Sequence, residues 1–139
     1  MTDKPDGLGL TADLILRPEW TVLESHDKSF VAGVVDAATG VSVTVAYVVP
    51  AGKTLYITQF SWRSKGNLVA DRDNNHMCDG IILDVTSASY YWYQGSNAGG
   101  AAHLVKPISI PSAHTVNFDC TNLANHNCDL VVFAAGYEL

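Results

Sequence analysis

The most evident deficiency of the 139-residue sequence is charge. Charged residues make up 16% of the chain, against about 25% in an average soluble domain. Glutamate occurs only at Glu19, Glu24 and Glu138. Charge is depleted at the centres of protein–protein interfaces, but the strands and turns of β-rich proteins also favour Thr, Ser and Asn. The composition therefore favours either plain β-structure or a surface that other protein molecules cover.

Basic residues and long apolar runs are also scarce. Eight Lys and Arg residues stand against 14 Asp and Glu, which gives a net charge of −6. Affinity for nucleic acid depends on neutralising phosphates, so we expect no nucleic-acid partner. No run approaches the roughly 20 apolar residues that span a bilayer, and the first residues are polar and acidic, unlike a secretory leader. We therefore expect synthesis in the cytoplasm and no membrane partner.

Cysteine is rare and odd in number. The three residues are Cys78, Cys120 and Cys128, so complete pairing within one chain is impossible. Disulfides are uncommon in proteins made in the cytoplasm, where free cysteines behave as small buried apolar side chains. We expect three reduced thiols, mostly buried.

The hydrophobic pattern indicates strands rather than helices. Apolar residues never recur at i, i+3, i+4 and i+7 for three turns, whereas many alternate with a period of two. Strict alternation places Leu55 and Ile57 on one face of a strand. It places Phe60 and Trp62 on the opposite face, which predicts a strand covered on both sides. The predicted strands are residues 30–35, 41–47, 55–62, 81–86, 90–94, 103–110, 114–121 and 129–135.

The remaining segments predict one domain with an irregular N-terminal arm. Residues 1–28 carry prolines and glycines without a sustained apolar period, so we assign them to the arm and residues 29–139 to the domain. Residues 64–80 form a predicted polar loop. Residues 95–100, rich in glycine, form a predicted flexible connector.

The arm carries a net charge of −3, the wrong sign for packaging nucleic acid. Its apolar residues, among them Leu14 and Leu16, and the aromatic Trp20 are candidate contacts to another protein.

A repeated corner narrows the choice among all-β folds. The segment Val49-Pro-Ala-Gly-Lys-Thr-Leu-Tyr-Ile57 is echoed 61 positions later by Ile110-Pro-Ser-Ala-His-Thr-Val-Asn-Phe118. In each copy a proline, which cannot donate to a strand ladder, ends one strand, and a β-branched Thr opens the next. The same corner half a chain apart suits two Greek keys. We therefore predict an all-β antiparallel sandwich, the eight-stranded jelly roll.

Catalytic and metal-binding motifs are weak. Two pairs, His76/Cys78 and His126/Cys128, offer nitrogen and sulfur ligands of the kind that zinc uses, with Cys120 nearby. Structural zinc sites space such ligands by two to four residues more often, and the His-x-His pair of metal-binding cupins is absent. No Gly-x-Ser-x-Gly nucleophile motif occurs. We expect no metal, no cofactor and no enzymatic activity, and keep a cupin-like metal enzyme as a third alternative.

The stretch Tyr90-Tyr91-Trp92-Tyr93 is the most unusual of the chain. On a regular strand Tyr90 and Trp92 face one way, and Tyr91 and Tyr93 face the other. One pair can enter the core, and the other then needs a cover or a ligand. Tyr and Trp are favoured anchors of protein interfaces, and they also stack on sugar rings.

Taken together, the acidic jelly roll, the irregular arm, the Val49–Thr58 corner and the Gly136-Tyr-Glu-Leu139 ending resemble the capsid decoration proteins, or cement proteins, of tailed bacteriophages. The resemblance implies a virion protein on the capsid surface, assembled in the host cytoplasm, that binds the major capsid protein and stabilises contacts between capsomers. It also implies self-association as a homotrimer. We expect Trp20, Tyr91 and Tyr93 to be contact anchors.

The same Pro-Ala-Gly-Lys-Thr corner also occurs in phage fibre heads. A glycan- or receptor-binding head of a phage fibre is therefore the alternative function, with the aromatics of residues 90–93 stacking on sugar.

Overall fold

The computed structural model describes residues 27–66, 68–71 and 75–139. Within these residues the chain forms eight strands and a single turn of 3₁₀ helix, η1 (Val69–Asp71). No helix in the described part of the chain is long and apolar enough to cross a membrane. The strands are β1 (Asp27–Ala37), β2 (Ser42–Val48), β3 (Leu55–Gly66), β4 (Met77–Asp84), β5 (Ser89–Asn97), β6 (Gly99–Ile110), β7 (Thr115–Asn122) and β8 (Cys128–Glu138).

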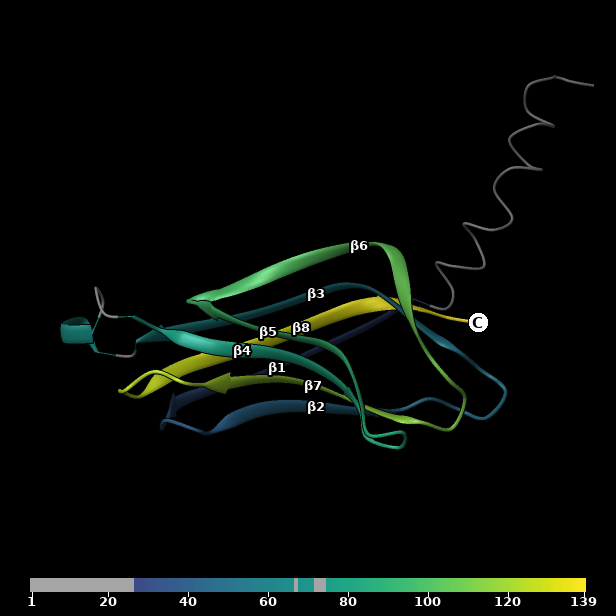
Figure 1. Cartoon of the computed structure of the whole chain (residues 1–139), viewed down its shortest axis with the longest axis horizontal. Coiled ribbons are helices and arrows are strands. Elements are labelled where there is room, and N and C mark those ends of the chain that lie inside the picture. Colours follow the sequence, from purple (N-terminus) through teal and green to yellow (C-terminus); the bar gives the residue numbers. More distant parts are fainter. Residues whose placement is uncertain (1–26, 67, 72–74) are drawn as a thin grey trace, which may run out of the picture.

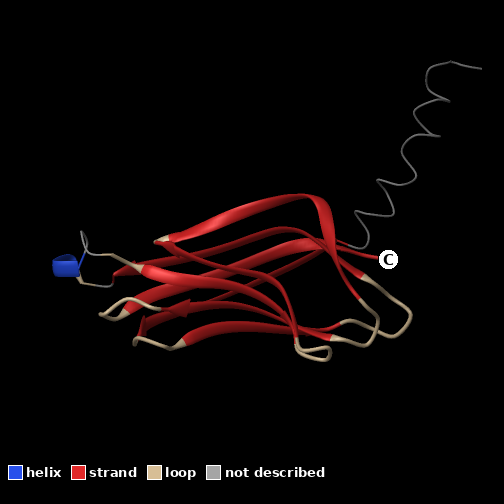
Figure 2. Ribbon diagram, in the orientation of Figure 1, coloured by secondary structure: helices blue, strands red, loops and turns tan. Residues whose placement is uncertain are grey.

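The strands form two four-stranded antiparallel sheets that pack face to face (Figures 1 and 2). The first sheet has the order β1-β8-β3-β6 and the second the order β2-β7-β4-β5. The chain crosses between the sheets at every connection except the β4–β5 hairpin. This order confirms the predicted eight-stranded jelly roll. The predicted arm, apart from its last two residues, lies outside the described residues.

The two proline corners adopt the same turn, as their sequence echo predicts. In the first, the Lys53 N–H donates to the Pro50 carbonyl at 3.1 Å, and in the second the His114 N–H donates to the Pro111 carbonyl at 3.3 Å. The third residue of each turn has a positive φ, +80° at Gly52 and +65° in the equivalent alanine of the second corner. The corners also contact each other, so one end of the sandwich, called the corner end below, is built from a repeated unit.

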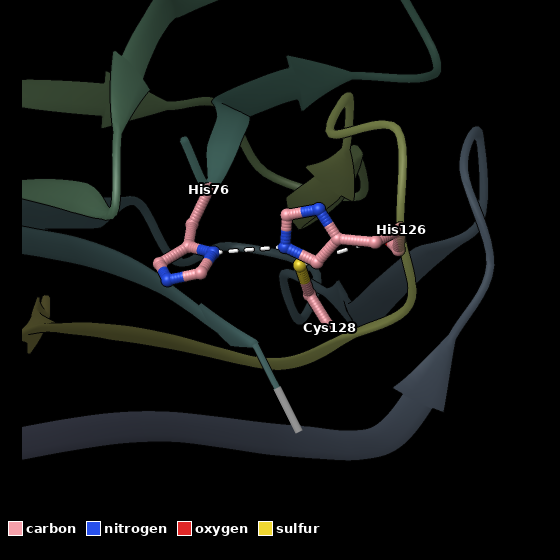
Figure 3. Close-up of side chains that lie close together, drawn as sticks. All are labelled: His76, His126 and Cys128. Atoms are coloured by element: carbon pink, nitrogen blue, oxygen red, sulfur yellow. Dashed lines mark hydrogen bonds between the residues drawn. The ribbon is translucent and has the colours of Figure 1, made fainter. Parts of the chain in front are cut away.

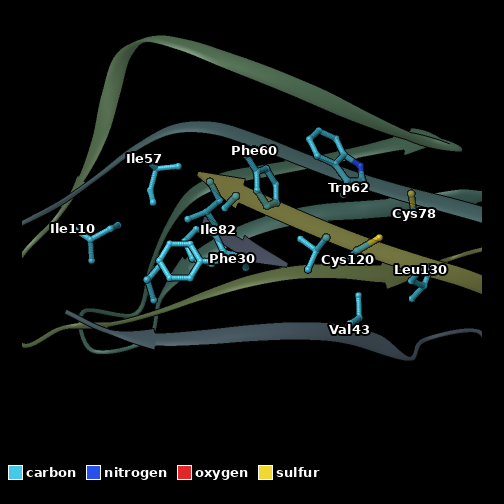
Figure 4. Close-up of a cluster of buried hydrophobic side chains, with 14 of the residues drawn as sticks. Phe30, Val43, Ile57, Phe60, Trp62, Cys78, Ile82, Ile110, Cys120 and Leu130 are labelled. Carbon is cyan, nitrogen blue, oxygen red and sulfur yellow. The ribbon is translucent and has the colours of Figure 1, made fainter. Parts of the chain in front are cut away.

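The space between the sheets is filled by apolar side chains from both (Figure 4). Phe60 and Trp62 stack in the first sheet with ring centroids 5.3 Å apart, and Phe60 also meets Phe118 of the second sheet at 6.3 Å. The indole of Trp62 lies directly over Gly80, where an added Cβ would come within 2.2 Å of the ring. Glycine at this position therefore lets the two sheets approach around a tryptophan.

A bulge corrects the face assignment predicted for β3. Ile57 pairs with Gly136 of β8 and Gln59 pairs with the adjacent Ala135, so Thr58 is an extra residue in the ladder. An extra residue reverses the alternation beyond it. Phe60 and Trp62 therefore point into the core on the same side as Leu55 and Ile57 rather than on the opposite face.

Two predicted loops are shorter than expected. The polar loop assigned to residues 64–80 loses both ends, because β3 continues to Gly66 and β4 begins at Met77. The prediction of a flexible connector at residues 95–100 is wrong, because β5 runs to Asn97 and β6 begins at Gly99. β5 and β6 meet at Ala98, which donates to the His76 carbonyl at 3.1 Å and accepts from the Ser64 N–H at 3.1 Å. Hydrogen bonds from neighbouring segments therefore order a stretch whose composition indicates freedom.

The first residues of β1 lie beside the last residues of β8, because Asp27 pairs with Tyr137. At the far end of the same ladder Ala37 pairs with Cys128. The C-terminal Leu139 exchanges two backbone hydrogen bonds with Thr54 at 2.8 and 3.1 Å, next to the first proline corner. The start of β1 and the C-terminus therefore both lie at the corner end.

Candidate functional site

Two tyrosines form an exposed aromatic patch on the outer face of the second sheet. Tyr90 and Tyr93, which we call the tyrosine patch, are 61% and 60% exposed, and their rings meet edge to face with centroids 5.4 Å apart. The Tyr93 hydroxyl donates to the Asp79 carboxylate, whose negative charge and hydrogen bond raise the pKa of Tyr93. Both rings are held by the fold yet remain largely open to solvent.

A second bulge creates this patch and corrects the predicted alternation of residues 90–93. Ile82 pairs with Trp92 and Leu83 pairs with Tyr90, which leaves Tyr91 as the extra residue. Tyr90 and Tyr93 therefore share the outer face, whereas Trp92 packs inward against Trp62 at 6.2 Å. Alternation alone predicts Tyr90 with Trp92 and Tyr91 with Tyr93, and both pairings are wrong.

The bulged Tyr91 turns toward the corner end. Burial raises the pKa of its hydroxyl, and so does the Asp84 carboxylate that it contacts. Tyr91 is 37% exposed. Of the five residues predicted as interface contacts, Tyr91 and Tyr93 are thus exposed but lie on different sides of β5, and Leu14, Leu16 and Trp20 lie outside the described residues.

The outer face of the first sheet carries exposed aliphatic side chains. Val31 and Val35 of β1 are 68% and 76% exposed, and Val131 of the neighbouring β8 is also exposed. Val31 pairs directly with the half-buried Phe133. We call Val31, Val35, Val131 and Phe133 the valine face. The two outer faces of the sandwich therefore each present apolar or aromatic surface.

A third feature lies at the end of the sandwich opposite the proline corners. His76, His126 and Cys128 each bring a metal-ligating atom to one place, and all three atoms lie within 4.8 Å of one another (Figure 3). His76 precedes β4, His126 lies in the β7–β8 loop and Cys128 opens β8. We call these residues the histidine–cysteine cluster, and the part of the molecule around them the histidine end.

The sequence offers these ligands in two pairs, but the structure takes one residue from the first pair and both from the second. Cys78, the partner of His76 in sequence, instead points into the core beside Cys120. A hydrogen bond between the two thiols, together with burial, raises the pKa of the Cys120 thiol. All three cysteines are free and buried, as predicted.

Comparison with known proteins finds no matching family and no matching curated protein. The function is therefore argued from the surfaces and clusters just described.

Proposed function

We propose that this chain is a structural virion protein that decorates the outside of a phage capsid. The observation that supports this function is that both outer faces of the sandwich expose apolar or aromatic side chains. The valine face lies on one side and the tyrosine patch on the other. A rigid body with two such faces can contact two neighbours at once. Contiguous exposed apolar surface is a common mark of protein–protein contact sites.

The two faces suit different contacts. Large, rigid tyrosines with a polar hydroxyl are typical anchors of specific interfaces. We therefore assign the tyrosine patch, together with Tyr91 on the other side of the edge strand β5, to contacts between copies in a homotrimer. The valine face is mainly aliphatic, with the exposed Arg63 of β3 paired to Val131 at its border, and we assign it to the major capsid protein. Binding only to the assembled shell stabilises that shell by mass action, and the effect is multiplied over many copies.

Two measurements separate these assignments. Sedimentation of the wild-type chain should show trimers at high concentration, and Tyr93→Glu should shift the population to monomers. The matched control is Val48→Glu, which places a charge on an exposed residue of the same sheet at β2. A wild-type chain that stays monomeric at high concentration would contradict the trimer.

Capsid binding is tested on emptied shells of the major capsid protein encoded in the same genome. We expect saturable, stoichiometric uptake of the wild-type chain, and loss of uptake for Val31→Glu with the trimer intact. Val105→Glu, at a fully exposed position of β6, is the control. Absence of uptake by shells in the expanded state would overturn the proposed function.

Glycan binding is the second candidate function, because the exposed rings of Tyr90 and Tyr93 lie next to the Asp79 carboxylate. Aromatic faces beside hydrogen-bonding groups are the usual components of a sugar platform. A glycan array distinguishes the two candidates. A capsid decoration protein leaves the array blank, whereas a fibre head gives signals that Tyr93→Ala removes.

A further inference from the structure

The histidine–cysteine cluster has a donor set that the capsid function does not use. We propose that His76, His126 and Cys128 bind a zinc ion that ties the β7–β8 loop to the segment before β4. Two imidazoles and a thiolate are borderline-soft ligands of the kind that Zn²⁺ prefers. The inference is independent of the proposed function and rests on the geometry of these three side chains.

The spacing of the donor atoms fits a tetrahedral ion. With Zn–N bonds of about 2.0–2.1 Å and Zn–S bonds of about 2.3 Å, tetrahedral ligands lie roughly 3.3 Å apart for two nitrogens and roughly 3.6 Å for nitrogen and sulfur. His76 Nδ1 and His126 Nε2 are 3.0 Å apart, and all three ligand atoms lie within 4.8 Å. A shift of a few tenths of an ångström between His76 and His126, and of at most about 1.2 Å between a nitrogen and the thiol, brings all three onto one ion.

Zinc requires a particular tautomer of each histidine, and a hydrogen bond already sets that of His126. The His126 Nδ1–H donates to the Asn125 side-chain oxygen at 3.1 Å, which leaves the lone pair of Nε2 directed at His76. A neutral imidazole whose far nitrogen donates to an oxygen is the usual form of a zinc ligand. Without metal, the proton of His76 Nδ1 links the two rings. Zinc binding at Nδ1 requires the other neutral tautomer of His76, so this proton moves through solvent from Nδ1 to Nε2, and the Cys128 thiol releases its proton to solvent as it becomes the thiolate ligand.

Buried polar contacts hold the backbone of the ligands in place before any metal binds. The fully buried Asn122 donates to the His126 carbonyl at 3.0 Å and to the Ala37 carbonyl at 2.9 Å, which fixes the β7–β8 loop. The His76 N–H donates to the Asn97 side-chain oxygen at 2.8 Å. Preorganised ligands lose little conformational freedom on binding, so the site requires little rearrangement.

Three protein ligands leave one tetrahedral position for water, and the partial exposure of His126 gives access to it. The ligands come from segments that are far apart in sequence and meet at one end of the sandwich. A position left to water is more usual at catalytic zinc, but this ion joins two segments that are distant in sequence, and on that ground we assign it a structural role in fastening the histidine end.

The test uses the full-length, tag-free chain, stripped with a chelator and titrated with Zn²⁺ alone or with Co²⁺ alone. We expect one ion per chain, a rise of several degrees in Tm with zinc, and, with cobalt, a thiolate-to-metal charge-transfer band together with the visible bands of a tetrahedral site. His126→Gln should abolish the Tm rise, since losing a ligand costs more than the roughly 10–100-fold in affinity that follows loss of an outer hydrogen-bond partner.

Matched variants keep the result interpretable. His103→Gln changes an exposed histidine of β6, and Cys78→Ala removes a buried thiol outside the cluster, so both should bind zinc like the wild type. Cys128→Ser should lose the charge-transfer band even if some affinity remains. Absence of zinc binding at micromolar concentration, equal binding by His126→Gln, or a cobalt spectrum without the bands of a tetrahedral thiolate site would each overturn the proposed site.

Discussion

Each end of the sandwich has a histidine, but the partners differ: a carboxylate at the corner end, and a second imidazole and a thiol at the histidine end. At the corner end, His114 Nδ1 lies 2.7 Å from Oδ2 of the fully buried Asp84, which also accepts a hydrogen bond from the Ser87 N–H at 3.1 Å. At the histidine end, His76 faces another histidine and a thiol. An imidazole beside a carboxylate has its hydrogen-bond partner within the protein. Two imidazoles and a thiol carry no charge of opposite sign, and once the shared proton and the thiol proton leave, their lone pairs can bind the cation that we propose.

The largest effect should come from breaking the pair at the corner end. His114→Ala leaves the buried Asp84 carboxylate without its main hydrogen-bond partner, and we expect a loss of about 2–3 kcal/mol in the free energy of unfolding. This loss lies below the roughly 3–5 kcal/mol for a fully buried ion pair because the His114 side chain is partly exposed. Denaturant unfolding of the variant measures the loss, with the exposed His103→Ala as control. A loss below that of the control would contradict the role of the pair.

Acid should weaken the corner end in a way that depends on Asp84. Burial alone raises the pKa of this carboxyl, but hydrogen bonds from His114 and Ser87 outweigh burial and hold the pKa below its usual value of 3.8. A lowered pKa in the folded state contributes stability above the pKa of the unfolded chain, and this contribution disappears as the pH falls toward the folded value.

We therefore expect the wild type to lose stability below about pH 4 more steeply than Asp84→Asn does. Thermal unfolding between pH 7 and pH 2.5 measures the two slopes. Parallel curves for the two proteins would show that Asp84 does not contribute to the acid response.

The smallest effect concerns the two copies of the proline turn. Gly52→Ala has open space for its methyl group but places alanine at a φ of +80°, so we expect a loss of about 1 kcal/mol. Ala113→Gly removes the same strain in the second copy, while its freer unfolded chain offsets the gain, and we expect a change below about 0.5 kcal/mol. Chemical denaturation of both variants checks the contrast, which equal effects would contradict.

The fold could be predicted largely because short stretches of the sequence mark where its strands and turns lie. Pro50 and Pro111 mark equivalent corners, and alternating apolar residues mark strands, so the number of strands and the jelly-roll arrangement follow. The bulges at Thr58 and Tyr91 could not be predicted, because nothing in a run of alternating residues signals an extra one. Each bulge reverses the faces of the residues beyond it, and both errors in face assignment arise there.

The candidate sites were only partly predictable. The spacing of His76, His126 and the cysteines identifies metal-ligand residue types, but it pairs His76 with Cys78, which the strand instead turns into the core. The cluster depends on where the β7–β8 loop closes, which the buried Asn122 decides through hydrogen bonds to distant carbonyls. The valine face likewise appears only when β1 and β8 become neighbours.

The pairing of Asp27 with Tyr137 has a practical consequence for engineering. Because the chain enters β1 and leaves after β8 at the same end of the molecule, a tag or fluorescent domain attached after Leu139 begins there, at the end opposite the loop between β7 and β8 (Figure 1). The histidine end thus stays unobstructed, and a fusion at the C-terminus could serve as a handle for tethering the domain in a defined orientation.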